Sequence, residues 1–124
     1  MKIKGSVALV TGANRGVGRA YVKMLLDMGA AKVYATARDA AKIADLAQPG
    51  KVEIIALDIT KADQVNAASA RAKDVNLLIN NAGVNKMSGF IAAQSVDGAR
   101  DEMEANYFGT LLMCRAFADR KSVV

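Results

Sequence analysis

Short apolar runs rich in β-branched residues alternate along the chain with segments whose apolar residues recur at helical spacing. The runs are too short for helices and favour buried parallel strands; they cover residues 6–10, 32–36, 52–57 and 75–80. The spacing between and after them predicts helices over about 17–28, 39–47, 60–72 and 96–118, with a helical turn in the loop 84–95. This alternation implies right-handed crossovers and an α/β fold, with a parallel sheet covered by helices on both faces.

Residues typical of helix ends and turns lie between these segments. Asp39 and Thr60 are predicted to cap the second and third helices, and Asp63 gives a weak variant of the capping box with Thr60. Gly29 fits a helix C-terminal cap, and Pro49-Gly50 fits a turn. Ile43 and Leu46 are expected to face inward, and the last helix carries an apolar stripe formed by Met103, Tyr107, Leu111, Cys114 and Phe117.

The composition fits one globular domain over residues 1–124, because apolar residues make up 52% of the chain and charge is moderate. The absence of histidine excludes His-based triads and histidine metal sites within this chain, and we predict no metal site. The single Cys114 cannot form an internal disulfide, and its place in a helix favours packing as a small apolar residue. No run approaches membrane-spanning length and no signal-peptide core is evident, so we expect a cytoplasmic protein with no membrane partner.

A glycine-rich stretch, Thr11-Gly12-Ala13-Asn14-Arg15-Gly16-Val17-Gly18, joins the first strand to the first helix. Gly12 allows a tight turn out of the strand, Gly16 lets a pyrophosphate approach the backbone, and Gly18 lets the helix pack against the strand. The N–H groups and the positive dipole end at the helix start stabilise phosphate charge. An ordinary glycine-rich turn is the alternative, but the strand–turn–helix context favours a nucleotide.

The spacing Thr-Gly-x-x-x-Gly-x-Gly resembles that of the short-chain dehydrogenase/reductase family, and a second motif of that family is Asn80-Asn81-Ala82-Gly83. The two motifs stand in the family's order and at its approximate spacing. The resemblance runs from about Lys4 to about Phe117 and covers the first half of the usual family protein. It implies a Rossmann-type doubly wound sheet with strand order 3-2-1-4, truncated after the long fifth helical segment, and ligands at the carboxyl ends of the strands.

Positive charge is concentrated in the half of the chain that holds the glycine-rich stretch. Residues 1–62 carry ten Lys/Arg against five Asp/Glu, whereas residues 63–124 carry seven of each. This suits an anionic cofactor, although scattered solvated lysines explain most of these charges. A nucleic-acid partner is not expected, because no basic cluster is interleaved with aromatic residues.

The cofactor that the resemblance implies is NADP(H) rather than NAD(H). Arg38 follows the second strand, where an arginine suits the 2′-phosphate of NADP and an acidic residue would suit NAD. Arg15 adds a second positive charge, and basic residues at these two places go with NADP preference in the family. The alternative is that both arginines are merely solvated. Asp39 follows Arg38 and fits a helix cap better than a ribose contact.

The resemblance implies roles for other residues near the strand ends. Asp58 matches an aspartate that contacts the adenine amino group, and Ile59 the residue that packs on the ring; a turn role is the alternative for Asp58. Asn81, Ala82 and Gly83 match a segment that lies along the cofactor in the family. The alternative is a turn with a purely structural role. Asn106 resembles a helix asparagine that helps to hold a water in the proton relay, unless it is simply exposed. The expected cofactor set is Gly12, Asn14, Arg15, Gly16, Val17, Gly18, Arg38, Asp58, Ile59, Asn81, Ala82 and Gly83.

The catalytic Ser and the Tyr-x-x-x-Lys pair of the family lie beyond the residues present. The residues four places after the three tyrosines are Leu25, Arg38 and Leu111, so none is a lysine that would lower the pKa of a phenol for proton transfer. One interpretation is the NADP(H)-binding part of an oxidoreductase that moves a hydride between the cofactor and a carbonyl or alcohol, inactive or nearly so by itself. The alternative is a non-catalytic dinucleotide-binding module or an isolated folding fragment, and a flavin-binding variant is a distant third.

In the full fold a fifth strand would flank the fourth, so the fourth strand is expected to present unpaired backbone groups here. The last helix would also lose packing partners. We expect this edge to be covered by self-association, by the tail Ser122–Val124 or by a partner chain.

Overall fold

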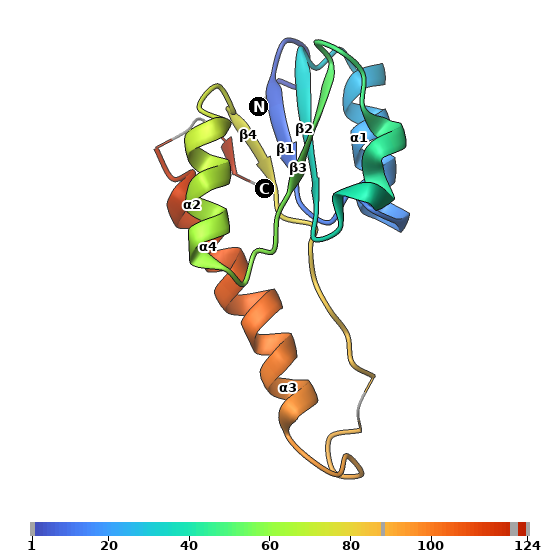
Figure 1. Ribbon diagram of the computed structural model, residues 1–124, viewed down its shortest axis with the longest axis vertical. Coiled ribbons are helices and arrows are strands. Elements are labelled where there is room, and N and C mark those ends of the chain that lie inside the picture. The colour runs from blue at the N-terminus through green and yellow to red at the C-terminus, as the bar shows by residue number, and fades with distance from the viewer. Residues whose placement is uncertain (1, 88, 120–121, 124) are drawn as a thin grey trace.

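The computed structural model describes residues 2–87, 89–119 and 122–123. Its elements, drawn in Figure 1, are β1 (Val7–Val10), α1 (Gly16–Asp27), β2 (Lys32–Ala37), the 3₁₀ helix η1 (Ala40–Leu46), β3 (Val52–Ala56), α2 (Ala62–Arg71), β4 (Leu77–Ile79), α3 (Asp97–Glu102), the π-helix η2 (Met103–Gly109), α4 (Thr110–Ala116) and β5 (Ser122–Val123). The elements α3, η2 and α4 follow one another without a break, and together we call them the long helix. Within the described ranges, no helix combines the length and the apolar character needed to cross a membrane.

The strands form one parallel sheet in the order β3-β2-β1-β4-β5. The register sets Leu9 of β1 beside Tyr34 of β2 on one side and Leu78 of β4 on the other. This confirms the predicted Rossmann-type α/β fold with the order 3-2-1-4. The edge of β4 that faces away from β1 pairs with β5. Of the three expected ways to cover this edge, the structure therefore shows the tail, through residues 122–123. Val124 lies outside the described residues.

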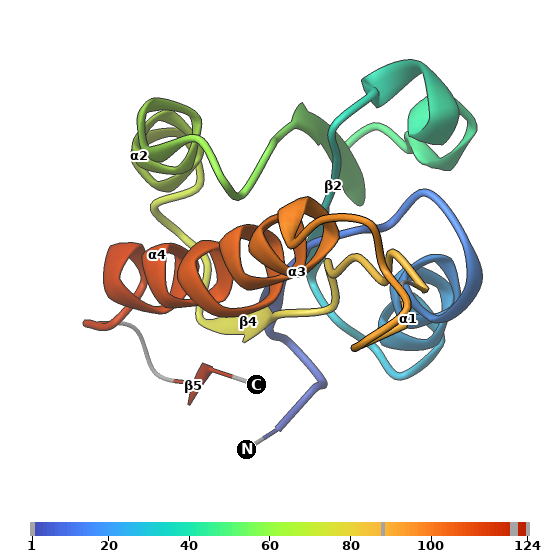
Figure 2. The same cartoon turned by 90° about the horizontal axis from the view of Figure 1, so that it is seen from below.

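Side chains alternate between two cores because successive strand residues point to opposite faces of the sheet. In β1, Ala8 and Val10 face one core whereas Leu9 faces the other. Figure 2 shows α1 and η1 on one side of the sheet and α2 with α4 on the other. Val22 and Leu25 of α1 fill the first core, and Met113 and Phe117 at the end of the long helix fill the second. From Ala8 to Val10, both faces of β1 are therefore buried, as a continuous apolar run predicts.

Two of the predicted helix ends are confirmed and one is wrong. The Asp39 carboxylate accepts a hydrogen bond from the Ala41 N–H at 3.0 Å, as a side-chain N-cap does. Gly29 has φ of +88° after the end of α1, the left-handed conformation of a helix C-terminus. Thr60 does not cap α2: its hydroxyl donates instead to the Asp58 carboxylate at 2.7 Å. An acceptor two residues earlier competes with the helix backbone for a threonine side chain.

The apolar stripe predicted for the last helix is only partly right: Phe117 is buried in the second core and Cys114 is half-buried, but the other three residues do not face the sheet. Met103, Tyr107 and Leu111 are 51%, 57% and 44% exposed. The buried residues recur one helical turn apart and are Ala105, Gly109, Met113 and Phe117. A Cβ on Gly109 would lie 2.8 Å from Ile59 Cγ1, so the small residues let the helix lie directly against the loop after β3. Cys114 is half-buried, as a small apolar residue would be, and its sulfur accepts from Asn80 Nδ2 at 3.5 Å.

Candidate cofactor site

The turn between β1 and α1 is tightly packed on the side that faces the protein and open on the side that faces solvent. Gly12 has φ of +66° and Gly16 φ of +53°, a region that favours glycine. A Cβ on Gly18 would lie 2.1 Å from the Gly12 carbonyl oxygen. A Cβ on Gly16 would meet no atom within 4 Å. This open side lies at the N-terminus of α1, where backbone N–H groups and the helix dipole favour an anion.

The buried hydroxyl of Thr11 joins this turn to the segment after β4. Its oxygen accepts hydrogen bonds from the backbone N–H of Asn81 at 3.0 Å and of Ala82 at 2.9 Å. In return, Asn81 Nδ2 donates to the carbonyls of Thr11 at 3.2 Å and Gly12 at 3.1 Å. The two motifs, about seventy residues apart, therefore hold each other in place. Sequence reasoning missed Thr11 as a site residue, although it opens the first motif.

A cavity of about 1040 Å³ lies at the carboxyl ends of β1, β2, β3 and β4. It brings together eleven of the twelve residues expected to bind a cofactor, namely Gly12, Asn14, Arg15, Gly16, Val17, Arg38, Asp58, Ile59, Asn81, Ala82 and Gly83. Gly18 is the exception, since it is buried beneath the turn. The two predicted helix caps, Asp39 and Thr60, also line the cavity. So do polar residues that the sequence did not single out: Lys42, Lys61, Lys86, Asp101 and Glu104.

Asp58 is the carboxylate at the end of β3, and its environment keeps it ionised. Burial raises its pKa, but hydrogen bonds from the Thr60 hydroxyl and backbone N–H outweigh burial, and the charges of Arg38 and Lys61 act in the same direction. The net result is a pKa below the usual value of an aspartate. An ionised carboxylate only accepts hydrogen bonds, which is what contact with an amino group requires. The turn interpretation also holds, because Asp58 caps its own turn through Thr60.

Asn106 does not line the cavity. Both the oxygen and the nitrogen of its side-chain amide form hydrogen bonds with the backbone of Val84. Its Oδ1 accepts from the Val84 N–H at 2.7 Å, and its Nδ2 donates to the Val84 carbonyl at 2.8 Å. The neighbouring Lys86 N–H donates to Glu102 at 2.7 Å. The two bonds of Asn106 fasten the residues after β4 to the π-helix η2, and the bond to Glu102 fastens them to the end of α3. Such π-turns are frequent at functional sites.

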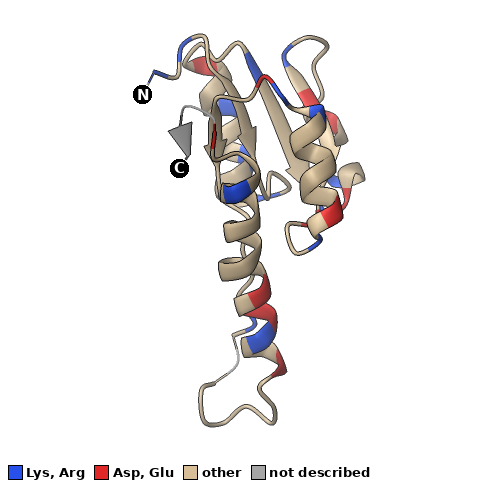
Figure 3. Ribbon diagram, turned by 90° about the vertical axis from the view of Figure 1, so that its left-hand side faces the viewer, with Lys and Arg blue, Asp and Glu red and all other residues tan. Residues whose placement is uncertain are grey.

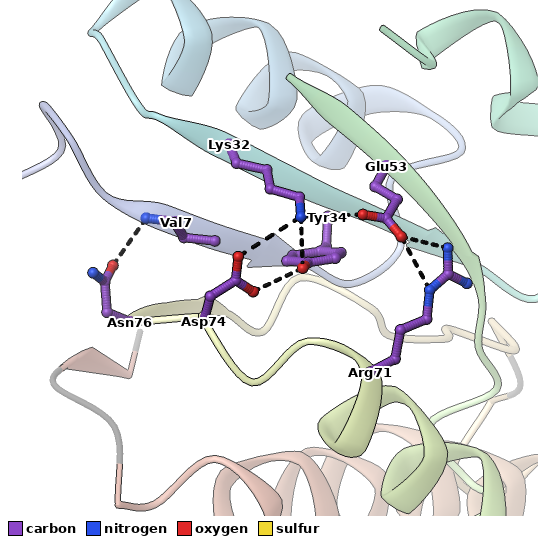
Figure 4. A network of polar contacts seen from close by, with 7 residues as sticks. All are labelled: Val7, Lys32, Tyr34, Glu53, Arg71, Asp74 and Asn76. Carbon is purple, nitrogen blue, oxygen red and sulfur yellow. Dashed lines mark hydrogen bonds and ion pairs between the residues drawn. The ribbon is translucent and has the colours of Figure 1, made fainter. Parts of the chain in front are cut away.

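A tyrosine and a lysine do meet in this chain, but at the opposite end of the sheet. Figure 4 shows Lys32 Nζ donating to the Tyr34 hydroxyl at 2.8 Å, while that hydroxyl donates to Asp74 at 2.7 Å. Lys32 also pairs with Glu53 at 3.1 Å. Burial raises the pKa of Tyr34 above its usual value, the opposite of what proton transfer needs. Lys32 begins β2, about 16 Å of strand away from the cavity edge, so this cluster stabilises strands rather than serving the cavity.

A parallel sheet of this order, with a glycine-rich turn and a cavity at its carboxyl edge, defines a Rossmann-type nucleotide-binding domain. The family model of the short chain dehydrogenases matches residues 6–122, and the chain belongs to this family.

Relatives of known structure or curated sequence are about two to three times longer. A short chain dehydrogenase from Burkholderia cenocepacia J2315 in complex with NADP is 49% identical, with a TM-score of 0.90 over 96% of this chain and 49% of that chain. A 3-ketoacyl-(acyl-carrier-protein) reductase from Brucella melitensis complexed with NADH is 30% identical, with a TM-score of 0.83 over 96% and 51%. The short-chain dehydrogenase/reductase prx1 of Penicillium roqueforti is 32% identical over 90% of this chain, which spans 34% of its length.

Proposed function

We propose that this chain is the NADP(H)-holding part of a short-chain oxidoreductase. The observation that carries the proposal is the gathering of eleven expected residues around one cavity. Relatives are described with NADP and with NADH, so family membership leaves the choice of cofactor open. The choice of NADP(H) is supported by Arg15 and Arg38, which both line the cavity, and by Asp39, whose carboxylate is engaged in capping η1.

The residues present fit such a cofactor from end to end. The open backbone at Gly16 would receive the pyrophosphate, Asp58 and Ile59 would hold the adenine, and the 81–83 segment would lie along the rest. A bound nicotinamide supplies the hydride chemistry. Asn106 is proposed only as an accessory residue that helps to hold a water. The chain has no Tyr-x-x-x-Lys pair, so we propose that by itself it binds cofactor with little or no turnover, and that a carbonyl or alcohol substrate requires residues outside it.

A parallel titration with NADPH, NADH and FMN tests this function, with the melting temperature and ligand fluorescence as readouts. NADPH is expected to bind in preference to NADH and to raise the melting temperature, since a ligand that binds only the folded state stabilises it. Arg38→Asp should abolish that preference, while Lys23→Asp, which makes the same charge change on the exposed face of α1 outside the cavity, should keep it. A folded chain that binds no dinucleotide would support the folding-fragment alternative, and FMN binding alone would support the flavin alternative.

We also propose that residues 1–124 fold as one domain that self-associates through the long helix. The β4 edge is already paired with β5, whereas the face with Met103, Tyr107 and Leu111 is exposed. Figure 3 shows acidic residues gathered on the half of this helix that is farther from the sheet; they are Asp97, Asp101, Glu102 and Glu104, with Arg100 among them. Arg115 lies toward the other end, so two antiparallel copies would bring opposite charges together.

The self-association proposal is tested by the molar mass from light scattering between micromolar and millimolar chain. A concentration-dependent rise toward a dimer is expected, and Leu111→Lys should reduce it by placing a charge on the apolar face. Lys61→Ala, outside that face, serves as the control. A wild-type chain that stays monomeric throughout would refute self-association without bearing on the cofactor proposal.

A further inference from the structure

We propose that Lys42 is a third cation of the 2′-phosphate site, so that preference for NADP(H) over NAD(H) depends on Lys42 as well as on Arg15 and Arg38. This inference rests on the proposed function. The three cations come from three different elements: the glycine-rich turn, the end of β2 and the 3₁₀ helix η1. All three line the same cavity, and all three are exposed to solvent and so to a ligand that enters it.

The fold fixes the backbone of Lys42 from both directions along η1. On its N-terminal side, the Lys42 N–H donates to the Asp39 carbonyl at 3.2 Å, next to the cap that Asp39 forms. On its C-terminal side, Ile43 is fully buried in the core between η1 and the sheet. With its neighbour buried, Lys42 is held on the solvent side of η1, where it reaches the cavity wall.

A side chain from α1 connects η1 to the glycine-rich turn. Arg19, one helical turn after Arg15, donates from Nη1 to the Lys42 carbonyl at 3.3 Å and forms an ion pair with Asp45. This tie keeps the element that carries Lys42 beside the element that carries Arg15. It also engages the Asp45 carboxylate, just as capping engages that of Asp39. In the part of the chain that the structure describes, neither of these two carboxylates forms an ion pair with Lys42, so its ammonium group is available to an anion.

The difference between the two cofactors makes this role measurable. NADPH and NADH differ by one phosphate group on the adenosine ribose, so a cation that contacts this group strengthens binding of NADPH only. A residue that merely supports the shape of the cavity would change both affinities together. The ratio of the two dissociation constants therefore separates a phosphate contact from a structural effect.

The experiment measures the dissociation constants of NADPH and NADH for the wild-type chain, Lys42→Ala, Lys42→Arg and Lys23→Ala. Lys42→Ala is expected to weaken NADPH about fivefold and to leave NADH within about twofold, the size of one exposed charge-assisted contact. Lys42→Arg should restore most of the NADPH affinity. Lys23→Ala removes the same charge from α1 outside the cavity and should leave both constants unchanged, which controls for the long-range field.

Each other outcome overturns a separate claim. If the wild-type chain prefers NADPH and Lys42→Ala keeps the same ratio, Lys42 has no part in the phosphate site, while the proposed function stands. An equal loss of both cofactors in Lys42→Ala would assign the lysine a structural role and would also overturn the inference. If the wild-type chain binds neither cofactor, both the inference and the proposed function fail.

Discussion

Gly18→Ala should destabilise the chain, although the helix propensities of the two residues predict the reverse. Gly18 lies in the first turn of α1 and its φ is not in the left-handed region, so an alanine there needs no backbone strain. Replacing glycine by alanine in a helix gains up to about 1 kcal/mol. The new Cβ, however, would lie 2.1 Å from the Gly12 carbonyl oxygen and 2.5 Å from Asn81 Nδ2.

The size of the effect follows from what must move. Overpacking costs about 1–3 kcal/mol. The Asn81 amide, if it is pushed aside, gives up two hydrogen bonds to the turn, at about 1 kcal/mol each. After subtracting the gain in helix propensity, we expect the free energy of unfolding to fall by about 2–4 kcal/mol. For a chain of this size, that corresponds to a melting temperature lower by about 10 °C.

Urea unfolding followed by far-UV circular dichroism measures this difference, and NADPH titration shows whether the turn still receives the cofactor. Gly5→Ala is the matched control: it also adds one methyl group, with open space around it but φ of +77°. Strain alone should cost that variant about 1 kcal/mol, and NADPH binding should be retained. A Gly18→Ala chain as stable as the wild type would refute the packing argument.

Three further expectations concern single side chains. Thr11→Val removes the acceptor of two backbone N–H groups and should lower the free energy of unfolding, measured by urea unfolding, by about 2 kcal/mol. Thr11→Ser keeps the hydroxyl and should lose less than half of that. Equal losses in the two variants would show that the hydroxyl does not stabilise the fold. Burial raises the pKa of Tyr34 above its value of about 10 in the unfolded chain, so this contribution to stability is complete below pH about 10 and is lost as the pH rises further. Urea unfolding of Tyr34→Phe between pH 9 and about 11.5 should therefore show a shallower alkaline decline than the wild type, and an identical slope would contradict this. Asn106→Ala removes both hydrogen bonds to Val84 and should loosen the loop that follows β4. Chymotrypsin should then cleave faster after the fully exposed Phe90, which mass spectrometry measures. An unchanged cleavage rate would show that these bonds do not hold the loop.

The sheet and most of the cavity were predictable because their signals are local. A glycine-rich stretch between a strand and a helix places the turn, and the carboxyl ends of parallel strands meet at one edge whatever follows. The packed face of the long helix was not predictable in this way. Hydrophobicity favours Met103 and Tyr107 over Ala105 and Gly109, whereas the close approach of the helix to Ile59 requires small residues, and that contact exists only in three dimensions.

Thr11 and Lys42 were missed for a related reason. The role of Thr11 depends on backbone N–H groups about seventy residues later. The place of Lys42 in the cavity wall depends on η1 being held against the sheet and α1, which neither the spacing nor the charge of the residue indicates. Thr60 was placed in the wrong role because a cap and an Asx-type turn use the same residue types.

The bond between Thr11 and the segment after β4 also determines when the nucleotide turn can exist during folding. The turn is complete in sequence once α1 has been synthesised, yet its carbonyls and its hydroxyl have their partners only after residues 81 and 82 have docked beside β1. A nascent chain that ends before β4 therefore carries the motif without these hydrogen bonds. Because contacts between segments some seventy residues apart form only after the intervening chain has closed, a cofactor that requires the completed turn would be captured by a refolding chain only once β4 lies next to β1.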